Sequence, residues 1–295
     1  MKKFELNSRD TQKKIKISLL LATYGRFSEV LYFCESLNSQ IVNLCQVELI
    51  IIDQNEDCRL ENSLRMLKCE YDLIYRKELV KSLSSARNIA LKMARGCIIG
   101  YPDDDCLYYP NTLNEVISYF EKNSYHKLVL GRIYDRESGE GIIKKWPKSN
   151  KKVNLFNYYK FSNSITLFHA HLPGIVFDEK MGAGRYFGSA EDVDFLYRIL
   201  ESGVRADYIT SIEVWHPKFK PEEISLSKVR SYARGFGFFI RKRHSFMAQK
   251  YMHLIILIGY KFYQLFSNSL TRKFRRGYFL QYSIGMYEGF FGSEK

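Results

Sequence analysis

The segment Ile17-Ser-Leu-Leu-Leu-Ala-Thr23 decides the fold class, because it is a short, almost continuous apolar run that ends at a polar residue. Three runs of the same kind follow along the chain, at Glu48–Asp53, Tyr71–Tyr75 and Cys97–Tyr101. Patterns typical of helices separate these runs. Continuous apolar strands that alternate with helices are characteristic of a parallel sheet covered on both faces. The sequence therefore predicts an α/β protein with a mostly parallel sheet flanked by helices.

The helix after the third run has the clearest pattern. Ser84 and Ser85 can cap its start, because serine hydroxyls accept hydrogen bonds from the free backbone N–H groups there. Arg87 and Asn88 lie in the first turn, off the apolar stripe of this helix. The stripe is formed by residues at steps of three and four: Ala86, Ile89, Ala90, Met93 and Ala94.

The patterns in the rest of the chain are weaker. A helix is predicted at residues 191–201, ended by Gly203. From Leu226 to Lys295 the pattern predicts basic amphipathic helices rich in tyrosine, phenylalanine and arginine. Short strands are predicted at residues 128–134, 165–168, 174–177, 207–210 and 212–215.

The chain carries a net charge of +13, and most of it is local. Residues 221–295 hold 13 Lys and Arg against 4 Asp and Glu, a net charge of +9. Such a basic region favours an anionic partner: a membrane surface, a pyrophosphate-linked substrate or a nucleic acid.

The apolar runs are far shorter than the roughly 20 residues of a spanning helix. The six cysteines form no metal-binding pairs and indicate reduced thiols, so we expect a cytoplasmic protein, soluble or peripheral on a membrane.

Asp103, Asp104 and Asp105 follow the fourth apolar run directly. Ligands of open α/β proteins bind at the carboxyl edge of the parallel sheet, where this triplet is expected to lie. Adjacent carboxylates repel one another, and a divalent cation such as Mg²⁺ or Mn²⁺ would relieve that repulsion. The alternative is a solvated acidic turn.

A second acidic cluster, Glu191-Asp192-Val193-Asp194, opens the predicted helix. Carboxylates at this position either stabilise the helix dipole or supply a general base. Asp53 ends the second apolar run, where it either accepts hydrogen bonds from a base or ribose or forms a turn.

Five motifs in one order carry a resemblance to a known family: Ala22-Thr-Tyr-Gly-Arg26, Ile52-Asp53, Ser85-Ala-Arg-Asn88, Asp103-Asp-Asp105 and Glu191-Asp192. Each motif is weak alone, but the ordered set closely resembles the family 2 glycosyltransferases with the GT-A fold. The resemblance covers about residues 15 to 220. It implies a catalytic domain over residues 1–220, with a donor half at 15–106 and an acceptor half at 107–220, and a helical extension over 221–295.

The resemblance also implies roles for single residues in binding the nucleotide-sugar donor. Thr23, Tyr24 and Arg26 would line the nucleotide. Asp53 would contact the base. Arg87 and Asn88 would face the diphosphate or the base, and Asp103 and Asp104 would complete the donor site.

The same comparison assigns the metal and the base. Asp103 and Asp105 match the D-x-D motif, with Asp105 expected to touch Mn²⁺ or Mg²⁺, although a pair of residues 104 and 105 stays open. His216 stands where some members supply a late metal ligand, and a structural histidine is the alternative. Asp192 would be the general base, with Glu191 or Asp194 as alternatives.

The function implied is that of an inverting transferase that moves a sugar, most often from UDP, to an acceptor hydroxyl. The acceptor expected is a saccharide or a lipid-linked saccharide in bacterial surface polysaccharide synthesis, at the inner face of the plasma membrane. Two alternatives stay open: a nucleic-acid-binding protein that uses the basic region, and a nucleotidyltransferase that makes nucleotide-sugars. The first leaves the carboxylate clusters unexplained, so no nucleic acid is expected as a partner. The second would require a glycine-rich, basic loop after the first strand, and this sequence has no such loop there.

Overall fold

The computed structural model describes residues 3–5, 14–123, 125–218, 223–243 and 277–292. The chain divides into two compact units, one of residues 1–176 and 196–218 and the other of residues 177–195 and 219–295. Residues 177–195 belong to the second unit, and the sequence-based division at residue 220 stays a prediction.

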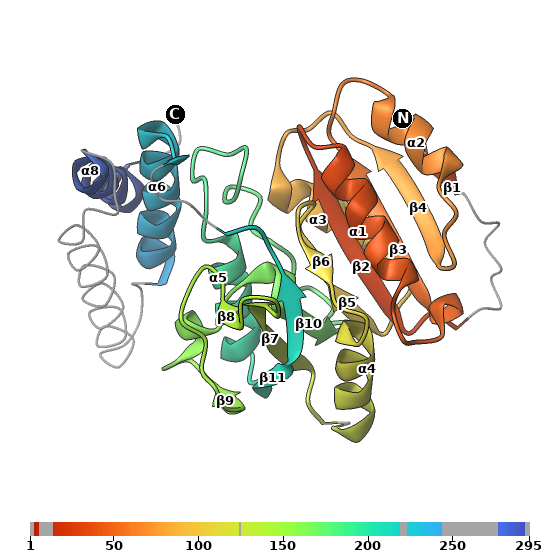
Figure 1. Cartoon of the computed structure of the whole chain (residues 1–295). Helices are drawn as coiled ribbons and strands as arrows, with labels where there is room; N and C mark the ends of the chain where they lie inside the picture. Colours follow the sequence, from red (N-terminus) through yellow and green to blue (C-terminus); the bar gives the residue numbers. More distant parts are fainter. Residues whose placement is uncertain (1–2, 6–13, 124, 219–222, 244–276, 293–295) are drawn as a thin grey trace. The chain divides into compact units, whose positions relative to one another are not determined.

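The first unit is built on one sheet with the strand order β1-β4-β3-β2-β5-β10-β7-β11-β6 (Figure 1). The strands β2 to β5 are parallel to one another, and β10 then joins the sheet antiparallel to both β5 and β7. The sheet is therefore parallel from β4 through β3 and β2 to β5, and mixed elsewhere. The strands are β1 (Lys3–Glu5), β2 (Ile17–Thr23), β3 (Val47–Asp53), β4 (Asp72–Lys77), β5 (Ile98–Gly100), β6 (Leu107–Tyr108), β7 (Leu128–Asp135), β8 (Glu140–Gly141), β9 (Lys151–Val153), β10 (Leu167–Ala170) and β11 (Ala206–Trp215).

The central strands are buried on both faces, as their apolar sequences predict. Every residue of β2 and of β3 is buried. Helices cover them because a strand without a polar face must be packed from both sides. The helices of this unit are α1 (Ser28–Asn38), α2 (Arg59–Met66), α3 (Leu83–Leu91) and α4 (Thr112–Lys122), and α3 packs on β2 and β3.

Five predicted strands and three predicted helices are confirmed: the strand predicted at residues 128–134 is β7, and the helix predicted after the third apolar run is α3. The apolar runs form β2, β3, β4 and β5. The helix α5 has the predicted bounds, Glu191–Glu201. Gly203 follows it with a φ of 84°, the left-handed conformation in which helices commonly end. The helix α6 (Leu226–Arg243) begins at the predicted residue.

Other predictions were wrong in instructive ways. No strand forms at residues 174–177, because Gly174 has a φ of 80° and the chain turns there. The strands predicted at 207–210 and 212–215 are one strand, β11, with an irregular register in its middle. The strand predicted at 165–168 begins as a short 3-10 helix (Ser164–Thr166), and β10 follows it. The cap of α3 is Ser82, which accepts a hydrogen bond from the backbone N–H of Ser85.

In the second unit α6 packs against α8 (Tyr278–Phe291) over most of their length. Glycines allow the two backbones to touch. A Cβ atom at Gly289 would overlap the carbonyl oxygen of Arg234, and one at Gly285 would overlap that of Arg230. Close approach of this kind is possible only where a side chain is missing. The helices predicted within residues 244–276 lie outside the described residues.

Two further expectations concern the whole chain. All six cysteines are free thiols, as the sequence indicates. Among the helices that the structure describes, none combines the length and the apolar character needed to cross a membrane.

Candidate functional site

The polar residues predicted to act together lie at one edge of the parallel sheet. Thr23 ends β2 and Asp53 ends β3, and the two are register partners in the parallel pair. The triplet Asp103–Asp105 follows β5, the neighbour of β2 on its other side. Thr23 Oγ1 donates a hydrogen bond of 2.8 Å to Oδ2 of Asp104. The three segments are therefore brought together at the carboxyl edge, as the strand pattern predicts.

Asp104 is the most buried carboxylate of the triplet, and both of its oxygens are engaged. Oδ2 accepts from Thr23, and Oδ1 accepts from Nη1 of Arg26. Burial raises the pKa of Asp104, and the charge of Arg26 with the Thr23 hydroxyl counteracts part of that rise. Asp104 thus ties the loop after β2 to the loop after β5.

Asp103, Asp105 and His216 form a cluster that could hold a metal ion. One potential ligand atom from each lies within 4.8 Å of the others. His216 follows β11 directly, and its Nε2 lies 3.4 Å from Oδ1 of Asp105. Its other ring nitrogen, Nδ1, lies 2.7 Å from the carbonyl oxygen of Pro217 and donates to it. A backbone carbonyl in this role is typical of metal-binding histidines, because it leaves Nε2 aimed at the ion.

The charged groups of this cluster shift the pKa values of one another. Burial opposes a charge on His216, but the hydrogen bond and the negative charge of Asp105 outweigh burial and raise the pKa of His216. Burial acts against ionisation of Asp105 as well, yet His216 and Arg26 together lower the pKa of that carboxyl group. Each of the two groups therefore favours the charged form of the other.

The triplet is also neutralised by arginines, which the sequence argument did not foresee. Arg26 Nη2 lies 2.7 Å from Oδ2 of Asp105, and Arg87 Nη2 lies 2.8 Å from Oδ1 of Asp103. The repulsion among three adjacent carboxylates is thus relieved in part by the chain itself. The triplet alone does not require a metal ion, and the case for one depends on the ligand geometry with His216.

Arg87 and Asn88 are both buried, although the helical pattern placed them off the apolar stripe. Arg87 is only 1% exposed. Its Nη2 donates to Asp103 and, at 2.9 Å, to Oγ of Ser164. Arg87 therefore links α3, the acidic triplet and the segment that leads into β10.

A second set of contacts shapes the loop after β3. Asp53 is fully buried, and its Oδ1 accepts from the backbone and the side chain of Asn55 at 2.9 and 2.8 Å. Its Oδ2 accepts from the hydroxyl of Tyr75 at 2.8 Å. Asn55 in turn accepts from the backbone N–H of Gly25, whose φ of 79° favours glycine. These contacts fix the loops after β2 and β3 against each other.

Tyr24 lies in the loop after β2 and is 53% exposed. The ammonium group of Lys81 lies over its ring, 4.9 Å from the ring centre. An exposed aromatic ring at this edge is suited to stacking on a flat ligand. Tyr75, Asn55 and Lys81 were missed by the sequence reasoning; only Asn55, next to Asp53, carried a local signal.

The acidic cluster at the start of α5 belongs to the second unit. Asp194 is fully buried, and its Oδ1 lies 2.6 Å from Arg243 Nη2 and 3.0 Å from Lys242 Nζ, both on α6. Glu191 is buried, whereas Asp192 is partly exposed. Ala190, just before them, has a φ of 66°, a conformation that is strained for a residue with a Cβ atom. Of the three acids, Asp192 is thus the one that solvent and ligands reach most easily.

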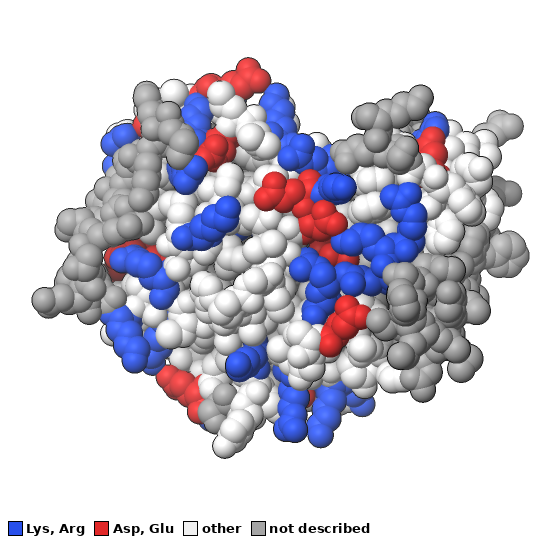
Figure 2. Space-filling model, turned by 180° about the vertical axis from the view of Figure 1, so that it is seen from behind, with Lys and Arg blue, Asp and Glu red and all other residues white. Residues whose placement is uncertain are grey.

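Figure 2 shows one face of the molecule, on which acidic and basic side chains lie next to one another. The described residues on this face do not present an uninterrupted basic surface, the usual footprint of a protein that binds nucleic acid.

The comparisons with known proteins agree with one another. The sequence profile of Glycosyl transferase family 2 matches residues 18–176. An uncharacterized glycosyltransferase of Methanocaldococcus jannaschii is 22% identical over 198 residues, which are 65% of this chain and 67% of that protein.

Solved structures share the fold at low identity. TarS of S. aureus, residues 1–349, in complex with UDP-GlcNAc has a TM-score of 0.68 and 18% identity, over 93% of this chain and 80% of that one. In another crystal structure of S. aureus TarS, this chain covers only 44% of the length of the TarS chain. A mannosyltransferase of Pyrobaculum calidifontis in complex with GDP-Man and Mn²⁺ has a TM-score of 0.62 and 12% identity, over 97% and 90%.

Proposed function

Because this chain belongs to glycosyl transferase family 2 and has the GT-A type of fold, we propose that it moves a sugar from a nucleotide-diphospho-sugar to an acceptor hydroxyl, with inversion at the anomeric carbon. The observation that carries the proposal is the cluster of Asp103, Asp105 and His216 at the carboxyl edge of the sheet. Family membership favours this transferase over the nucleic-acid-binding and nucleotidyltransferase alternatives.

The donor nucleotide would lie at the edge formed by the loops after β2 and β3. Tyr24 offers an exposed ring there for the base. Asp53 and Asn55 are hydrogen-bonded to each other in the loop after β3 and would form the neighbouring part of that edge. Uridine is the base that we propose, and guanosine is the alternative that an experiment has to separate from it.

The residues present fit a divalent cation. Asp103, Asp105 and His216 would hold it, and the ion would neutralise the diphosphate that leaves with the nucleoside. Two carboxylates and one imidazole favour Mn²⁺ over Mg²⁺, which prefers oxygen ligands throughout. Arg26, which lies beside the same carboxylates, would pair with the diphosphate once the ion occupies the acidic residues.

Asp192 is the group that we propose as general base. It would take the proton from the acceptor hydroxyl while that oxygen forms a bond to the anomeric carbon and the bond from that carbon to the diphosphate oxygen breaks. Asp194 is unsuited to this role, because Lys242 and Arg243 already neutralise it. Its contacts instead fix the first turn of α5, from which Asp192 projects.

The acceptor that we propose is a lipid-linked saccharide used in surface polysaccharide synthesis, reached at the inner face of the membrane. Residues 241–276 carry nine Lys and Arg and no Asp or Glu. On α8, Leu280, Tyr287 and Phe291 are 61, 67 and 68% exposed and fall on one side of the helix. An apolar stripe combined with excess basic charge is suited to a peripheral position on anionic lipid. Flotation of the full chain with anionic and neutral vesicles at low salt tests this part, and equal recovery with both would contradict it.

A thermal-shift screen tests the donor site. UDP- and GDP-linked sugars are added with Mn²⁺, with Mg²⁺ or with a chelator, and the ligand that binds the folded state raises the melting temperature by mass action. We expect one nucleotide class to stabilise the protein, and to do so more strongly with Mn²⁺. Asp105→Asn should abolish the Mn²⁺-dependent part, whereas Asp57→Asn, an exposed carboxylate paired with Arg59, serves as the control. If no nucleotide-sugar moves the melting temperature under any of these conditions, the proposed function is wrong.

A further inference from the structure

The strand that carries His216 is irregular just before it reaches that residue. In the pairing of β11 with β7, Tyr208 lies opposite Leu130 and Glu213 lies opposite Arg132. The strand β11 therefore advances five residues while β7 advances two. Beyond this irregularity, the last residues of β11 pair with β7 in a new register and also with β6, instead of continuing the ladder of the first half. Side-chain contacts support this new register.

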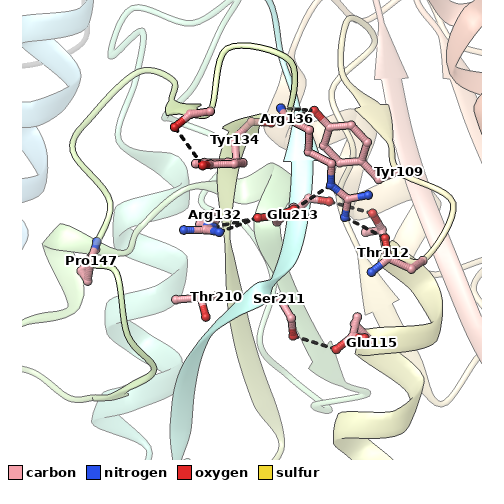
Figure 3. A network of polar contacts seen from close by, with 12 residues as sticks. Tyr109, Thr112, Glu115, Arg132, Tyr134, Arg136, Pro147, Thr210, Ser211 and Glu213 are labelled. Carbon is pink, nitrogen blue, oxygen red and sulfur yellow. Dashed lines mark hydrogen bonds and ion pairs between the residues drawn. The ribbon is translucent and has the colours of Figure 1, made fainter.

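Those contacts converge on Glu213 (Figure 3). Its Oε1 accepts from Nη2 of Arg132 at 2.5 Å and from Nε at 3.1 Å, and its Oε2 accepts from Nε of Arg136 at 2.7 Å. Its backbone carbonyl accepts from Oγ1 of Thr112 on α4 at 2.7 Å. Both ends of this residue are thus held, and we call Arg132, Arg136, Thr112 and Glu213 the Glu213 clamp.

The two guanidinium groups are themselves held in place. Arg132 stacks over the ring of Tyr134 at 4.1 Å, and Arg136 stacks over the ring of Tyr109 at 4.0 Å. The hydroxyl of Tyr109 donates to the carbonyl of Tyr134 at 3.0 Å, which ties the two stacks together (Figure 3). A planar guanidinium group that is stacked on a ring loses little conformational freedom when it binds a carboxylate. The two arginines are therefore already positioned for the carboxylate of Glu213.

The clamp lies next to the metal-binding cluster along the chain and across the sheet. Beyond Glu213, the residues Val214 and Trp215 pair with Tyr108 and Leu107 of β6. The strand β6 begins two residues after Asp105. The end of β11 is therefore aligned with the segment that carries the acidic triplet, and His216 reaches Asp105 at the end of that alignment.

We propose that Glu213 is a positioning residue that sets His216 for the divalent cation, an inference that rests on the proposed function. Stability alone does not account for the clamp, because replacing a buried ion pair by apolar side chains is often neutral or stabilising. Residues that orient metal-binding side chains commonly determine the affinity for the ion, and their loss weakens metal binding about 10- to 100-fold. The Glu213 clamp has the geometry of such a support, acting through the backbone of β11.

A double-mutant cycle on Mn²⁺ affinity tests the proposal. Binding of Mn²⁺ to the full chain with saturating UDP is followed by the electron paramagnetic resonance signal of the free ion. We expect Glu213→Gln to weaken binding about 10-fold. The double variant with His216→Ala should bind no more weakly than His216→Ala alone, because Glu213 acts through that residue. Glu115→Gln is the matched control, since Glu115 accepts from Ser211 on the same strand and lies outside the clamp.

The outcomes separate this inference from the function on which it rests. Unchanged affinity in Glu213→Gln, or losses that add in the double variant, would overturn the positioning role while leaving the metal site intact. If the wild type and His216→Ala bind Mn²⁺ equally, His216 is not a ligand of the ion, and Glu213 cannot act by positioning it. Should Glu213→Gln not fold, Arg136→Gln runs the same cycle, because its side chain is 38% exposed and its loss leaves Arg132 in place.

Discussion

Nη2 of Arg26 lies 2.7 Å from Oδ2 of Asp105, so the carboxylate expected to touch a metal ion is already paired with a cation of the chain. The same guanidinium also pairs with Asp104. Arg26 and a divalent cation would therefore compete for one patch of negative charge. This competition links metal binding to the position of Arg26, and it gives the arginine a second state in which it is free to meet a diphosphate.

Replacing Arg26 by Gln should strengthen the binding of Mn²⁺ in the absence of nucleotide. The gain expected is several-fold, because a half-exposed ion pair contributes up to about 1 kcal/mol. With a nucleoside diphosphate present, the gain should shrink or reverse, since the diphosphate loses its arginine partner. Titrations of Mn²⁺ with and without UDP measure both effects. Equal Mn²⁺ affinity for the variant and the wild type without UDP would show that Arg26 does not compete.

Asp192→Asn should suppress sugar transfer by about 10²- to 10⁴-fold, the usual contribution of a general base. Donor affinity and the melting temperature should stay near those of the wild type, because Asp192 is partly exposed and caps only its own turn. Transfer to an acceptor saccharide that the wild type uses, measured beside donor binding, separates these quantities.

Asp194→Asn is the matched comparison for that variant. It removes the buried charge that Lys242 and Arg243 share, although Lys242 keeps its ion pair with Asp178. Breaking a buried pair in this way typically costs about 3–5 kcal/mol, so the melting temperature should fall clearly. If Asp192→Asn were the unstable variant and Asp194→Asn the inactive but stable one, the two assignments would have to be exchanged.

The sequence could predict the parallel strands β2 to β5 because the information there is local. Each of the runs that became β2 and β3 is apolar along its whole length, and a fully buried strand has few other solutions. The acidic triplet then follows from chain direction, since the loop after a parallel strand emerges at the carboxyl edge. The bounds of α5 are local as well, given by its acidic first turn and by Gly203.

What the sequence could not predict depends on contacts between distant residues. Arg87 is buried because it meets Ser164, 77 residues away, and no periodicity near Arg87 encodes that partner. The pairing of Arg26 with Asp104 spans 78 residues and escaped notice for the same reason. The two predicted halves of β11 are joined through an irregular register, which is set by β7 and β6 rather than by the strand itself.

Gly289→Ala should destabilise the second unit. The new methyl group would overlap the carbonyl oxygen of Arg234 on α6, and backbone atoms at that position can give way only by moving the whole helix. Overpacking of this kind costs on the order of 1–3 kcal/mol. Ser283→Ala, at a half-buried position of the same helix, is the control. Thermal unfolding of the two variants measures the difference, and equal melting temperatures would argue against direct backbone contact between α6 and α8.

His169 on β10 is a buried histidine whose two ring nitrogens are both satisfied in the neutral form. Nδ1 donates to the carbonyl of Ala170 at 2.6 Å, and Nε2 accepts from the hydroxyl of Tyr101 at 2.9 Å. Burial, together with a smaller effect of the nearby His171, lowers the pKa of His169 to about 4 against the opposing effect of the Ala170 carbonyl. The folded protein thus keeps this ring uncharged at neutral pH.

Stability should therefore fall as the pH drops from about 6.5 towards 4, because the unfolded chain takes up a proton on His169 in this window and the folded chain does not. The shift corresponds to about 3 kcal/mol over the whole window, and below pH 4 both states are protonated and the loss levels off. Other groups titrate in the same range, so the comparison is with His169→Gln, whose amide can still accept from Tyr101. Denaturant unfolding at several pH values should show a steeper decline for the wild type than for this variant. Parallel declines would mean that the folded protein admits a proton at His169 near pH 6.5, in conflict with the donor and acceptor pattern around the ring.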